Sequence, residues 1–324
     1  MPNARETAIV EVMADFFNGV QGVLTILLMI AVGFILGRRK WFSDETVTAM
    51  SRLVVGISLP AMLFSSVVST FTRQDIFIMG PSILVPLAVA SSLYGLAAIV
   101  AIIFRVPANR RGVFRACFAF ANTIFIGVPV NIALFGEQAV PYVTLYYLGN
   151  TAIFWTLGVY FIRRDNPAQR FPVFSRKTLA QIFSPSLIAF SIALLFVMFE
   201  LRLPSFFMAS LKYIAALLTP LAILIIGITL KPESLRRITP EIALILAARF
   251  VLAPAVVFFL VGRTNLPLLL KNVFFITAAM PSMTQIPLIA KAYGADHQSS
   301  GTAATVTTTV SLLVIPVYMI LLGA

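Results

Sequence analysis

The sequence has few of the side chains that most enzymes and metal sites use. Among 324 residues there is one cysteine, Cys117, and one histidine, His297. A single cysteine excludes a disulfide within the chain and a cysteine metal cluster, and a single histidine excludes a histidine metal site. The sequence also contains no Walker loop for ATP. We therefore expect neither an enzyme nor a resident cofactor.

Charged residues are scarce as well. They make up 11% of the chain, against about 25% in a soluble domain. Hydrophobic residues make up 60% of it, and several apolar runs exceed the roughly 18 residues that indicate a membrane span. The first run is too long for a cleaved signal peptide. We therefore expect an integral protein of a lipid bilayer.

Ten apolar segments have the length and composition of transmembrane helices, which predicts an all-α membrane protein. No aspartate or glutamate lies in the middle of any of them, because Glu137, Glu200 and Glu241 are all near segment ends. A carboxylate proton relay of the usual pump type therefore lacks its parts. The segments cover residues 19–37, 53–71, 76–104, 113–135, 140–162, 179–199, 213–230, 242–262, 273–290 and 301–322.

The net charge of +12 is concentrated in the loops between these segments. Alternate loops carry 15 lysines and arginines on one side of the membrane and, together with the N-terminal tail, 5 on the other. The positive-inside rule assigns the first set to the cytoplasm, so both termini are expected to be extracytoplasmic. Basic residues distributed in this way indicate membrane topology and not a nucleic-acid partner.

The two halves of the chain share a pattern at a constant offset of 158 positions. At this offset Pro129 and Gly136 fall on Pro287 and Gly294. Five spans per half is an odd number, so the second half is expected to enter the membrane from the opposite side, as an inverted 5+5 repeat. The expected domains are a first repeat at residues 1–163, a cytoplasmic linker at 164–178 and a second repeat at 179–324.

A second match supports the duplication. Leu59-Pro60 in the second span and Thr219-Pro220 in the seventh occupy equivalent places, and a basic residue precedes each proline by eight positions. These basic residues are Arg52 and Lys212. Matched, interrupted apolar segments in two halves are typical of secondary transporters and indicate where the binding site lies.

Prolines interrupt the fourth and ninth spans, at positions 129, 281 and 287. Each lacks an N–H and biases the preceding residue away from helix. A break of this kind persists in a bilayer only where it faces protein or a wet cavity, and it exposes a half-helix N-terminus with partial positive charge. Two such ends would suit a carboxylate; the alternative is an ordinary kink repaired by serine and threonine. The candidate substrate-binding residues are Asn122, Thr123, Gly127, Pro129, Pro281, Ser282, Thr284, Gln285 and Pro287.

Two further candidates lie inside other spans. Asn150 in the fifth span matches Thr308 in the tenth; these polar groups could line a cavity or bind a cation, or they could pack helices together. Arg249 lies about 7 residues into the eighth span, roughly 10 Å deep, where a charge normally faces the protein interior. It would serve as the counter-charge of an anionic substrate, or as a structural arginine that caps the carbonyls of the broken helices.

Taken together, these residues resemble the bacterial branch of the auxin efflux carrier family over nearly the whole chain. The resemblance depends on the 5+5 layout, Leu59-Pro60, Asn122-Thr123 with Gly127-Val128-Pro129, and Ala279-Met280-Pro281 with Pro287. It implies a fold shared with the bile acid:sodium symporters. Spans 1, 2, 6 and 7 would form a scaffold, and spans 3–5 and 8–10 a moving core with crossing broken helices. It also implies a place in the bacterial inner membrane and an organic-anion substrate, such as a dicarboxylate or an auxin-like aromatic acid.

The expected function is secondary transport of small carboxylates by elevator-like alternating access. Two alternatives stay open. One is a symporter coupled to Na⁺, which oxygen ligands at the crossing and in the tenth span would bind. The other is a membrane sensor without turnover. The expected partners are the organic anion, the lipid bilayer and a second copy of the chain bound through the scaffold helices, with no nucleic acid.

Overall fold

The computed structural model describes residues 21, 24–166, 185–230, 233, 236 and 238–322. Within these residues every regular element is a helix, and extended pairing is confined to an isolated bridge between Ala121 and Ser282. The predicted all-α class is therefore confirmed. Most of the predicted linker and the start of the predicted sixth span lie outside the described residues.

Five helical segments of the described chain are long and apolar enough to cross a bilayer: Asp44–Thr70, Gly80–Ile103, Ser205–Thr229, Pro240–Gly262 and His297–Tyr318. Shorter apolar helices are Leu24–Arg38, Thr123–Phe135, Pro185–Met198 and Leu268–Ala278. The layout of ten spans in two inverted halves stays a prediction. The α-helices are α2 (Asp44–Leu53), α3 (Leu59–Thr70), α4 (Arg73–Met79), α5 (Leu84–Ile103), α6 (Arg111–Ala119), α7 (Val128–Phe135), α8 (Val140–Ile153), α9 (Val159–Arg164), α11 (Pro185–Met198), α12 (Ser205–Ala216), α13 (Leu218–Thr229), α14 (Pro240–Ala247), α15 (Ala253–Gly262), α16 (Leu268–Ala278), α17 (Ile286–Ala292) and α18 (His297–Leu322).

Several prolines inside the apolar segments follow a π turn instead of breaking the helix. Val128, just before Pro129, donates its N–H to the carbonyl of Thr123, five residues back. This wider turn accommodates a ring that would otherwise clash with the carbonyl four residues back. The expectation that Pro129 itself interrupts the fourth span is therefore wrong, because it lies within the helical segment Thr123–Phe135. The π turns Val54–Ser58 and Ala248–Leu252 precede Pro60 and Pro254 in the same way.

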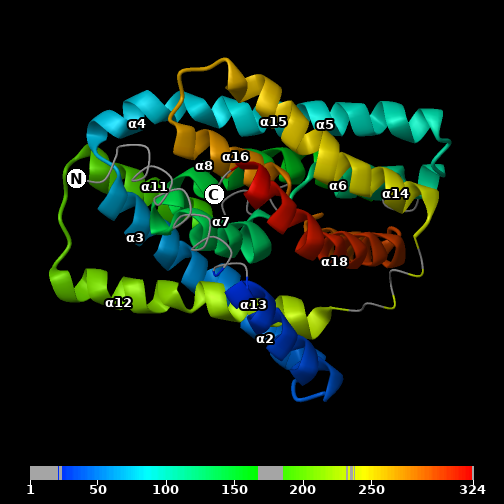
Figure 1. Ribbon diagram of the computed structural model, residues 1–324, viewed down its shortest axis with the longest axis horizontal. Coiled ribbons are helices and arrows are strands. Elements are labelled where there is room, and N and C mark those ends of the chain that lie inside the picture. The colour runs from blue at the N-terminus through cyan, green and yellow to red at the C-terminus, as the bar shows by residue number, and fades with distance from the viewer. Residues whose placement is uncertain are drawn as a thin grey trace, which may run out of the picture.

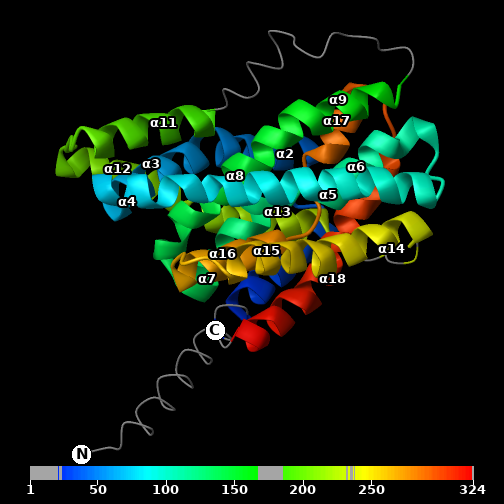
Figure 2. The same cartoon turned by 90° about the horizontal axis from the view of Figure 1, so that it is seen from above.

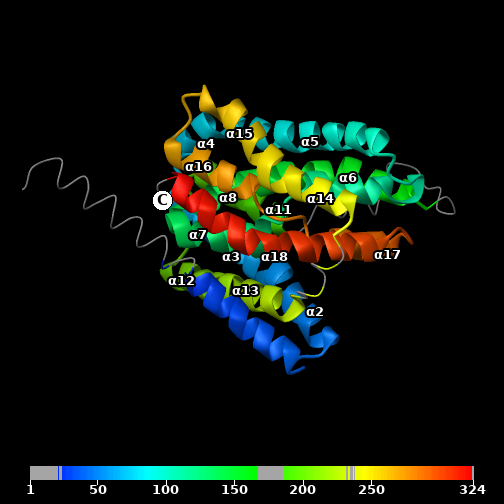
Figure 3. The ribbon, with the colours of Figure 1, turned by 45° about the vertical axis from the view of Figure 1, so that its right-hand side comes forward.

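Two groups of helices lie on opposite sides of the molecule. In Figures 1 and 3, α5 and α15 run along one side and α2, α12 and α13 along the other, with α7, α8 and α16 between them. On the second side α3 packs against α11 and α12, and α2 packs against α13. On the first side α5 packs against α6, α8 and α15. The first side thus holds predicted core spans and the second side predicted scaffold spans; that they move relative to each other stays a prediction.

The helix Leu24–Arg38 and α13 approach each other through glycines. A Cβ added at Gly227 would meet the carbonyl oxygen of Ile30 and would lie 2.8 Å from the Cα of Gly33. A Cβ at Gly33 would lie 2.5 Å from the carbonyl oxygen of Leu224. Small residues commonly allow membrane helices to pack this closely, since dispersion and not hydrophobic burial holds them together.

Replacing Gly227 with alanine should destabilise the protein by about 1–3 kcal/mol, the usual cost of overpacking. Backbone atoms face the added methyl group, so no side chain can move away to relieve the contact. The melting temperature of the purified protein in detergent measures the effect. Gly95→Ala is the matched control, because an added Cβ there meets nothing within 4 Å. Equal melting temperatures for the two variants would contradict the packing.

One end of the molecule carries Arg38, Arg110, Asp165, Glu233 and Tyr293, and we call it the basic face. The loops that the positive-inside rule assigns to one side of the membrane meet there. Figure 2 shows α9 beside α17, where Arg163 stacks on the Tyr293 ring. The other contacts are the ion pairs Arg38–Glu233 (2.7 Å) and Arg110–Glu241 (2.8 Å), and the hydrogen bonds from Asn166 Nδ2 to the Tyr293 carbonyl (3.1 Å) and from the Gly112 N–H to Asp165 (2.8 Å).

Asp165 caps the start of α6, the helix that leads into the first break. Its carboxylate accepts hydrogen bonds from the N–H groups of Gly112 (2.8 Å) and Val113 (2.9 Å). Burial raises the pKa of Asp165 from its ordinary value of 3.8 to about 6, although these two hydrogen bonds lower it. The folded protein therefore binds the Asp165 proton more tightly than the unfolded chain does.

The stability that comes from protonated Asp165 should be fully present below pH 3.8 and lost as the pH rises through about 6. We expect the melting temperature of the wild type to fall over this window. The Asp165→Asn variant, which has no proton to lose, should show a shallower fall. Parallel pH profiles for the two proteins would contradict the assignment.

Candidate functional site

The two broken segments cross and pair with each other. Helix is interrupted at residues 120–122, between α6 and the π turn Thr123–Gly127, and at residues 279–285, between α16 and α17. The Asn122 N–H donates to the Pro281 carbonyl (2.8 Å), and the Met283 N–H donates to the Phe120 carbonyl (3.0 Å). The two breaks thus satisfy part of each other's backbone, which a bilayer interior requires. We call residues 120–122 and 279–285 together the crossover.

Polar side chains satisfy more of the crossover backbone. The Asn150 amide brackets Ala121, accepting from its N–H (3.1 Å) and donating to its carbonyl (3.3 Å). The Ser282 hydroxyl donates to the Cys117 carbonyl (2.7 Å), and the Ser282 N–H donates to the Thr307 hydroxyl (3.1 Å). Asn150 and Ser282, both predicted as ligand groups, therefore hold the breaks in place.

Arg249 joins both breaks. It is fully buried, and its Nη1 donates to the Ala119 carbonyl (2.8 Å) at the end of α6. Its Nη2 donates to Ala278 (2.6 Å) and Met280 (2.9 Å), and its Nε also donates to Met280 (3.0 Å). These four bonds involve four of the five N–H groups of the guanidinium. This geometry is that of the alternative interpretation, an arginine that caps broken-helix carbonyls. Its contact with a substrate stays a prediction.

A cavity of about 860 Å³ lies beside the crossover, between the two helix groups. Thr284, Gln285 and Pro287 reach it from the second break, and Phe125 from the π turn after the first. Its other walls come from α2 and the π turn after it, the end of α13, the start of α17 and the first half of α18. The residues on these walls are Val47, Thr48, Ser51, Arg52, Val55, Gly56, Ile225, Ile226, Thr229, Leu230, Leu288, Gly301, Ala304, Thr305 and Thr308.

Arg52 is the cationic side chain in this lining. Within the described part of the chain, no hydrogen bond or ion pair joins its guanidinium to another residue. A second cavity of about 310 Å³, lined by Asp44, Glu45, Thr48, Ala49 and Arg52, continues from it toward the start of α2. The start of α2 follows the loop after Arg38, so the cavity lies toward the basic face.

The site role of Arg52 was missed at the sequence level because the second span was expected to begin at Leu53. The helix begins at Asp44, where the Ser43 side chain accepts from the Thr46 N–H as an N-cap. Arg52 therefore lies eight residues inside the segment Asp44–Thr70, about 12 Å from its start. The capping pattern of Ser43 followed by Asp44 and Glu45 is the signal that would have placed the helix start correctly.

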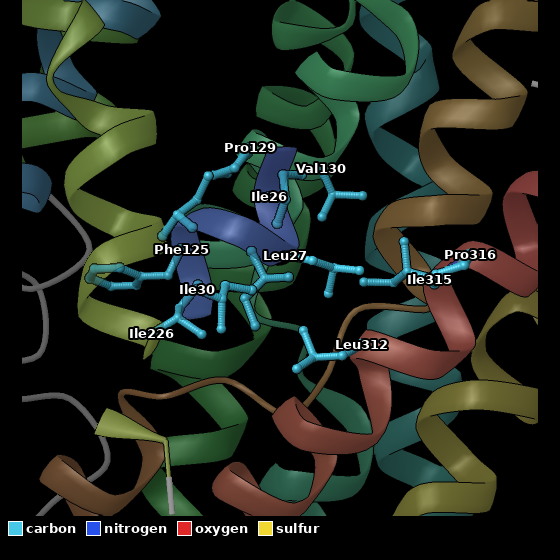
Figure 4. A pocket seen from close by; sticks show the side chains of 12 residues that line it. Ile26, Leu27, Ile30, Phe125, Pro129, Val130, Ile226, Leu312, Ile315 and Pro316 are labelled. Carbon is cyan, nitrogen blue, oxygen red and sulfur yellow. The ribbon is translucent and has the colours of Figure 1, made fainter. Parts of the chain in front are cut away.

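The other side of the crossover is closed by apolar side chains. Figure 4 shows Phe125 and Pro129 facing Ile26 and Ile30 of the first helix and Ile315 of α18. The space between them is about 30 Å³, room for little more than a water molecule. Along α18 the large cavity is lined by residues 301–308 and the seal by residues 312–316, so the two spaces follow one another along the helix.

The structure divides the predicted site residues into three sets. Thr284, Gln285 and Pro287 line the large cavity, and Pro129 lines the apolar seal. The rest do not line either space and are buried in or around the crossover. One of these buried groups, the Nδ2 of Asn122, has no hydrogen-bond partner among the described residues. The buried set is Asn122, Thr123, Gly127, Asn150, Arg249, Pro281 and Ser282.

Apolar helices that can cross a bilayer, two interrupted helices that pair at a crossing, and a cavity between two helix groups are the features of a membrane transport protein. Comparison with known proteins agrees. The chain matches the family described as "Membrane transport protein" over residues 19–319 and belongs to it. The resemblance to the auxin efflux carriers is thereby confirmed.

Relatives carry transporter names. The chain is similar to an "Uncharacterized transporter" of Methanocaldococcus jannaschii, with 26% identity over 91% of this chain and 96% of the relative. It is also similar to an "Uncharacterized transporter" of Methanothermobacter thermautotrophicus, with 23% identity over 95% of this chain and 99% of the relative. A protein of Rhizobium meliloti named "Putative malonate transporter" is 24% identical over 93% of this chain and 96% of the relative.

Proposed function

We propose that this protein is a secondary transporter of small organic anions that works by elevator-like alternating access. The observation that carries the proposal is the cavity at the crossover, where Arg52, which has no partner among the described residues, shares a lining with Thr284 and Gln285. The Arg52 side chain is exposed and lines the cavity, so an anion that enters the cavity can reach its guanidinium. A carboxylate bound there would pair with Arg52 and accept hydrogen bonds from Thr284 and Gln285.

The cavity lining also supports a substrate class. Arg52 is the cation among its residues, whereas Val47, Val55, Phe125, Ile225 and Leu288 present apolar surface. A second carboxylate would find no second cation in this lining, only neutral hydroxyls such as those of Thr229 and Thr305, which is unfavourable. We infer a monocarboxylate with an apolar body. A dicarboxylate is the second candidate, because one relative carries the name of a malonate transporter.

Alternating access is supported by the unequal sides of the crossover. The cavity lies toward the basic face, which the positive-inside rule assigns to the cytoplasm. The opposite side is closed by apolar contacts around Pro129. Movement of the helices around α5 and α15 past α2 and α13 would open that seal and close the cavity. In this reading the structure corresponds to the state that is open to the cytoplasm.

Uptake into proteoliposomes tests the proposal. Labelled benzoate, phenylacetate, malonate and succinate serve as probes, and liposomes without protein serve as the control. We expect saturable uptake that is faster for the two aromatic monocarboxylates. Saturable uptake of malonate alone would favour the second candidate. Binding in a thermal-shift assay without any uptake would favour a membrane sensor and overturn the transporter.

A further inference from the structure

The segments Asp44–Thr70 and Ser205–Thr229 are two copies of one element. An offset of 160 positions carries Pro60 onto Pro220 and Arg52 onto Lys212. Each copy is interrupted at the same place. The π turn Val54–Ser58 precedes Pro60, and helix α12 gives way to α13 at Leu217, three residues before Pro220. The repeat inferred from the positions of Pro60 and Pro220 therefore also appears as an interruption of the helix just before each proline.

The two copies lie antiparallel. The first half of one, α2, packs against the second half of the other, α13, and α3 packs against α12 in the same way. Figure 3 shows α2 alongside α13. A local two-fold relation of this kind exchanges the two ends of the pair. The two-fold rotation that superimposes Arg52 on Lys212 therefore also superimposes the basic face on the opposite face of the molecule.

The same offset identifies the α3 counterparts of the cavity wall that α13 forms. On α13 the cavity is lined by Ile225, Ile226, Thr229 and Leu230. Their counterparts are four hydroxyl residues of α3, a helix that is otherwise apolar. Two of the four, Ser69 and Thr70, are exposed, so water or an anion can reach their hydroxyls. Ser65 is buried and donates to the Met62 carbonyl (3.3 Å). The four residues are Ser65, Ser66, Ser69 and Thr70.

The other side of this counterpart surface belongs to the predicted moving core and comes from the first half of the chain. At the offset of 158 positions, the cavity residues Thr305 and Thr308 fall on Tyr147 and Asn150, and Pro287 falls on Pro129. Tyr147 is 7% exposed and Asn150 is 1% exposed, and Pro129 lies in the apolar seal. The counterpart of the cavity is therefore closed in this structure.

Lys212 lies seven residues into its segment, about 10 Å from the start. Its side chain is exposed, and in the described part of the chain no hydrogen bond or ion pair joins its ammonium to another residue. Its neighbours on the segment include Phe206, Phe207 and Tyr213, all exposed. A lone ammonium among such residues is costly in lipid and is normally kept where it faces water or an anion.

We propose that Lys212 is the anion-binding cation of a second cavity, the counterpart of the first, which opens on the face opposite the basic face. The proposal rests on the proposed function and names its second substrate site. Arg52 pairs with the carboxylate while the protein is open to the basic face. Lys212 takes the same role, with the hydroxyls of α3, when the protein is open to the other face.

Thiol labelling tests the surface without any need for transport. A Ser69→Cys reporter is made in a Cys117→Ala background, and intact cells are treated with sulfonatoethyl methanethiosulfonate, an anion, or with its trimethylammonium analogue. We expect the anionic reagent to react faster than the cationic one. The ratio of the two labelling rates should fall about tenfold when Lys212 is also changed to glutamine. Arg202→Gln, a nearby basic change outside the proposed cavity, is the control. An unchanged ratio in the Lys212→Gln protein, or equal loss in the control, overturns the proposal.

Sided transport gives a second readout. Initial rates of benzoate uptake are measured in right-side-out and in everted membrane vesicles. Lys212→Gln should raise the KM about tenfold in right-side-out vesicles only, and Arg52→Gln should raise it in everted vesicles only. A KM that rises equally in both preparations, or in neither, overturns the assignment of Lys212. Absence of wild-type uptake in both preparations would instead overturn the proposed function, and the labelling result would still decide the role of Lys212.

Discussion

Replacing Arg249 with glutamine should abolish transport and destabilise the protein by about 2–5 kcal/mol. The guanidinium joins the carbonyls of Ala119, Ala278 and Met280. A buried carbonyl that loses its partner costs about 1–3 kcal/mol, and the glutamine amide has only two N–H groups, so at least one of the three carbonyls loses its partner. Arg249→Lys should recover part of the loss, because an ammonium is a point donor without the planar fork. Melting temperature and uptake rate measure the two effects.

Chemical rescue separates this structural role from direct substrate binding. Arg249→Ala leaves a space of the shape of the missing side chain, and millimolar guanidinium ion should restore part of the stability in the absence of any substrate. Arg115→Ala is the matched control. The Arg115 guanidinium carbon lies 4.3 Å from the centre of the Tyr94 ring and 4.1 Å from that of Phe161, and the side chain does not join the breaks. A variant with normal stability and a defect only in substrate affinity would support the other reading, in which Arg249 contacts the anion.

The position of Arg249 also bears on sodium coupling. Carbonyls freed at helix breaks are the groups that coordinate Na⁺ in many transporters, and here the guanidinium occupies three of them. We therefore expect uptake to continue when sodium is replaced by choline. Loss of uptake in choline would establish the symporter alternative.

Changing Arg52 to glutamine should weaken substrate binding from the basic face by about 10- to 150-fold. This range corresponds to about 1.5–3 kcal/mol, the contribution of a hydrogen bond to a charged group. Arg52 has no protein partner in the described part of the chain, so its loss should leave the fold intact. The expected result is a raised KM in everted vesicles with an unchanged melting temperature.

Two further variants sharpen this test. Arg52→Lys keeps the charge and should lose less affinity than Arg52→Gln, since only the bidentate geometry is removed. Arg39→Gln removes an exposed basic residue of the same face that does not line the cavity, and it should have no effect. A similar loss of affinity in the Arg39 variant would mean that the basic face acts through its general charge. Wild-type affinity in the Arg52→Gln variant would remove Arg52 from the site.

Much of the fold was predictable because membranes restrict the choices. An apolar run long enough to cross a bilayer has to be helical in lipid. The structure has helices at the apolar runs of the sequence. The offset of 158 positions between Pro129 and Pro287 identified the two segments that pair at the crossover. Two glycines that the same offset matches have similar backbone conformations. Gly136 and Gly294, matched by the same offset, both adopt positive φ, at 76° and 66°.

The positions of the breaks were less predictable. Proline alone does not interrupt a helix when a π turn can absorb it, as at Pro129. The first break instead lies at residues 120–122, where no proline occurs. What stabilises it there is pairing with residues 281–283 and hydrogen bonds to Asn150, all distant in sequence. No local pattern contains those partners.

By itself, the sequence determined that this protein lies in a membrane, that its polar breaks recur in two halves, and that its basic loops belong to one face. Composition and periodicity record these properties because each depends on residues close together in the chain. Only the tertiary structure decided that Arg249 joins the carbonyls of two breaks, and that Arg52 faces the cavity beside Thr284 and Gln285. Whether an arginine of a predicted membrane segment meets a carbonyl or an open cavity depends on which helices pack around it, and that packing joins residues more than 100 positions apart.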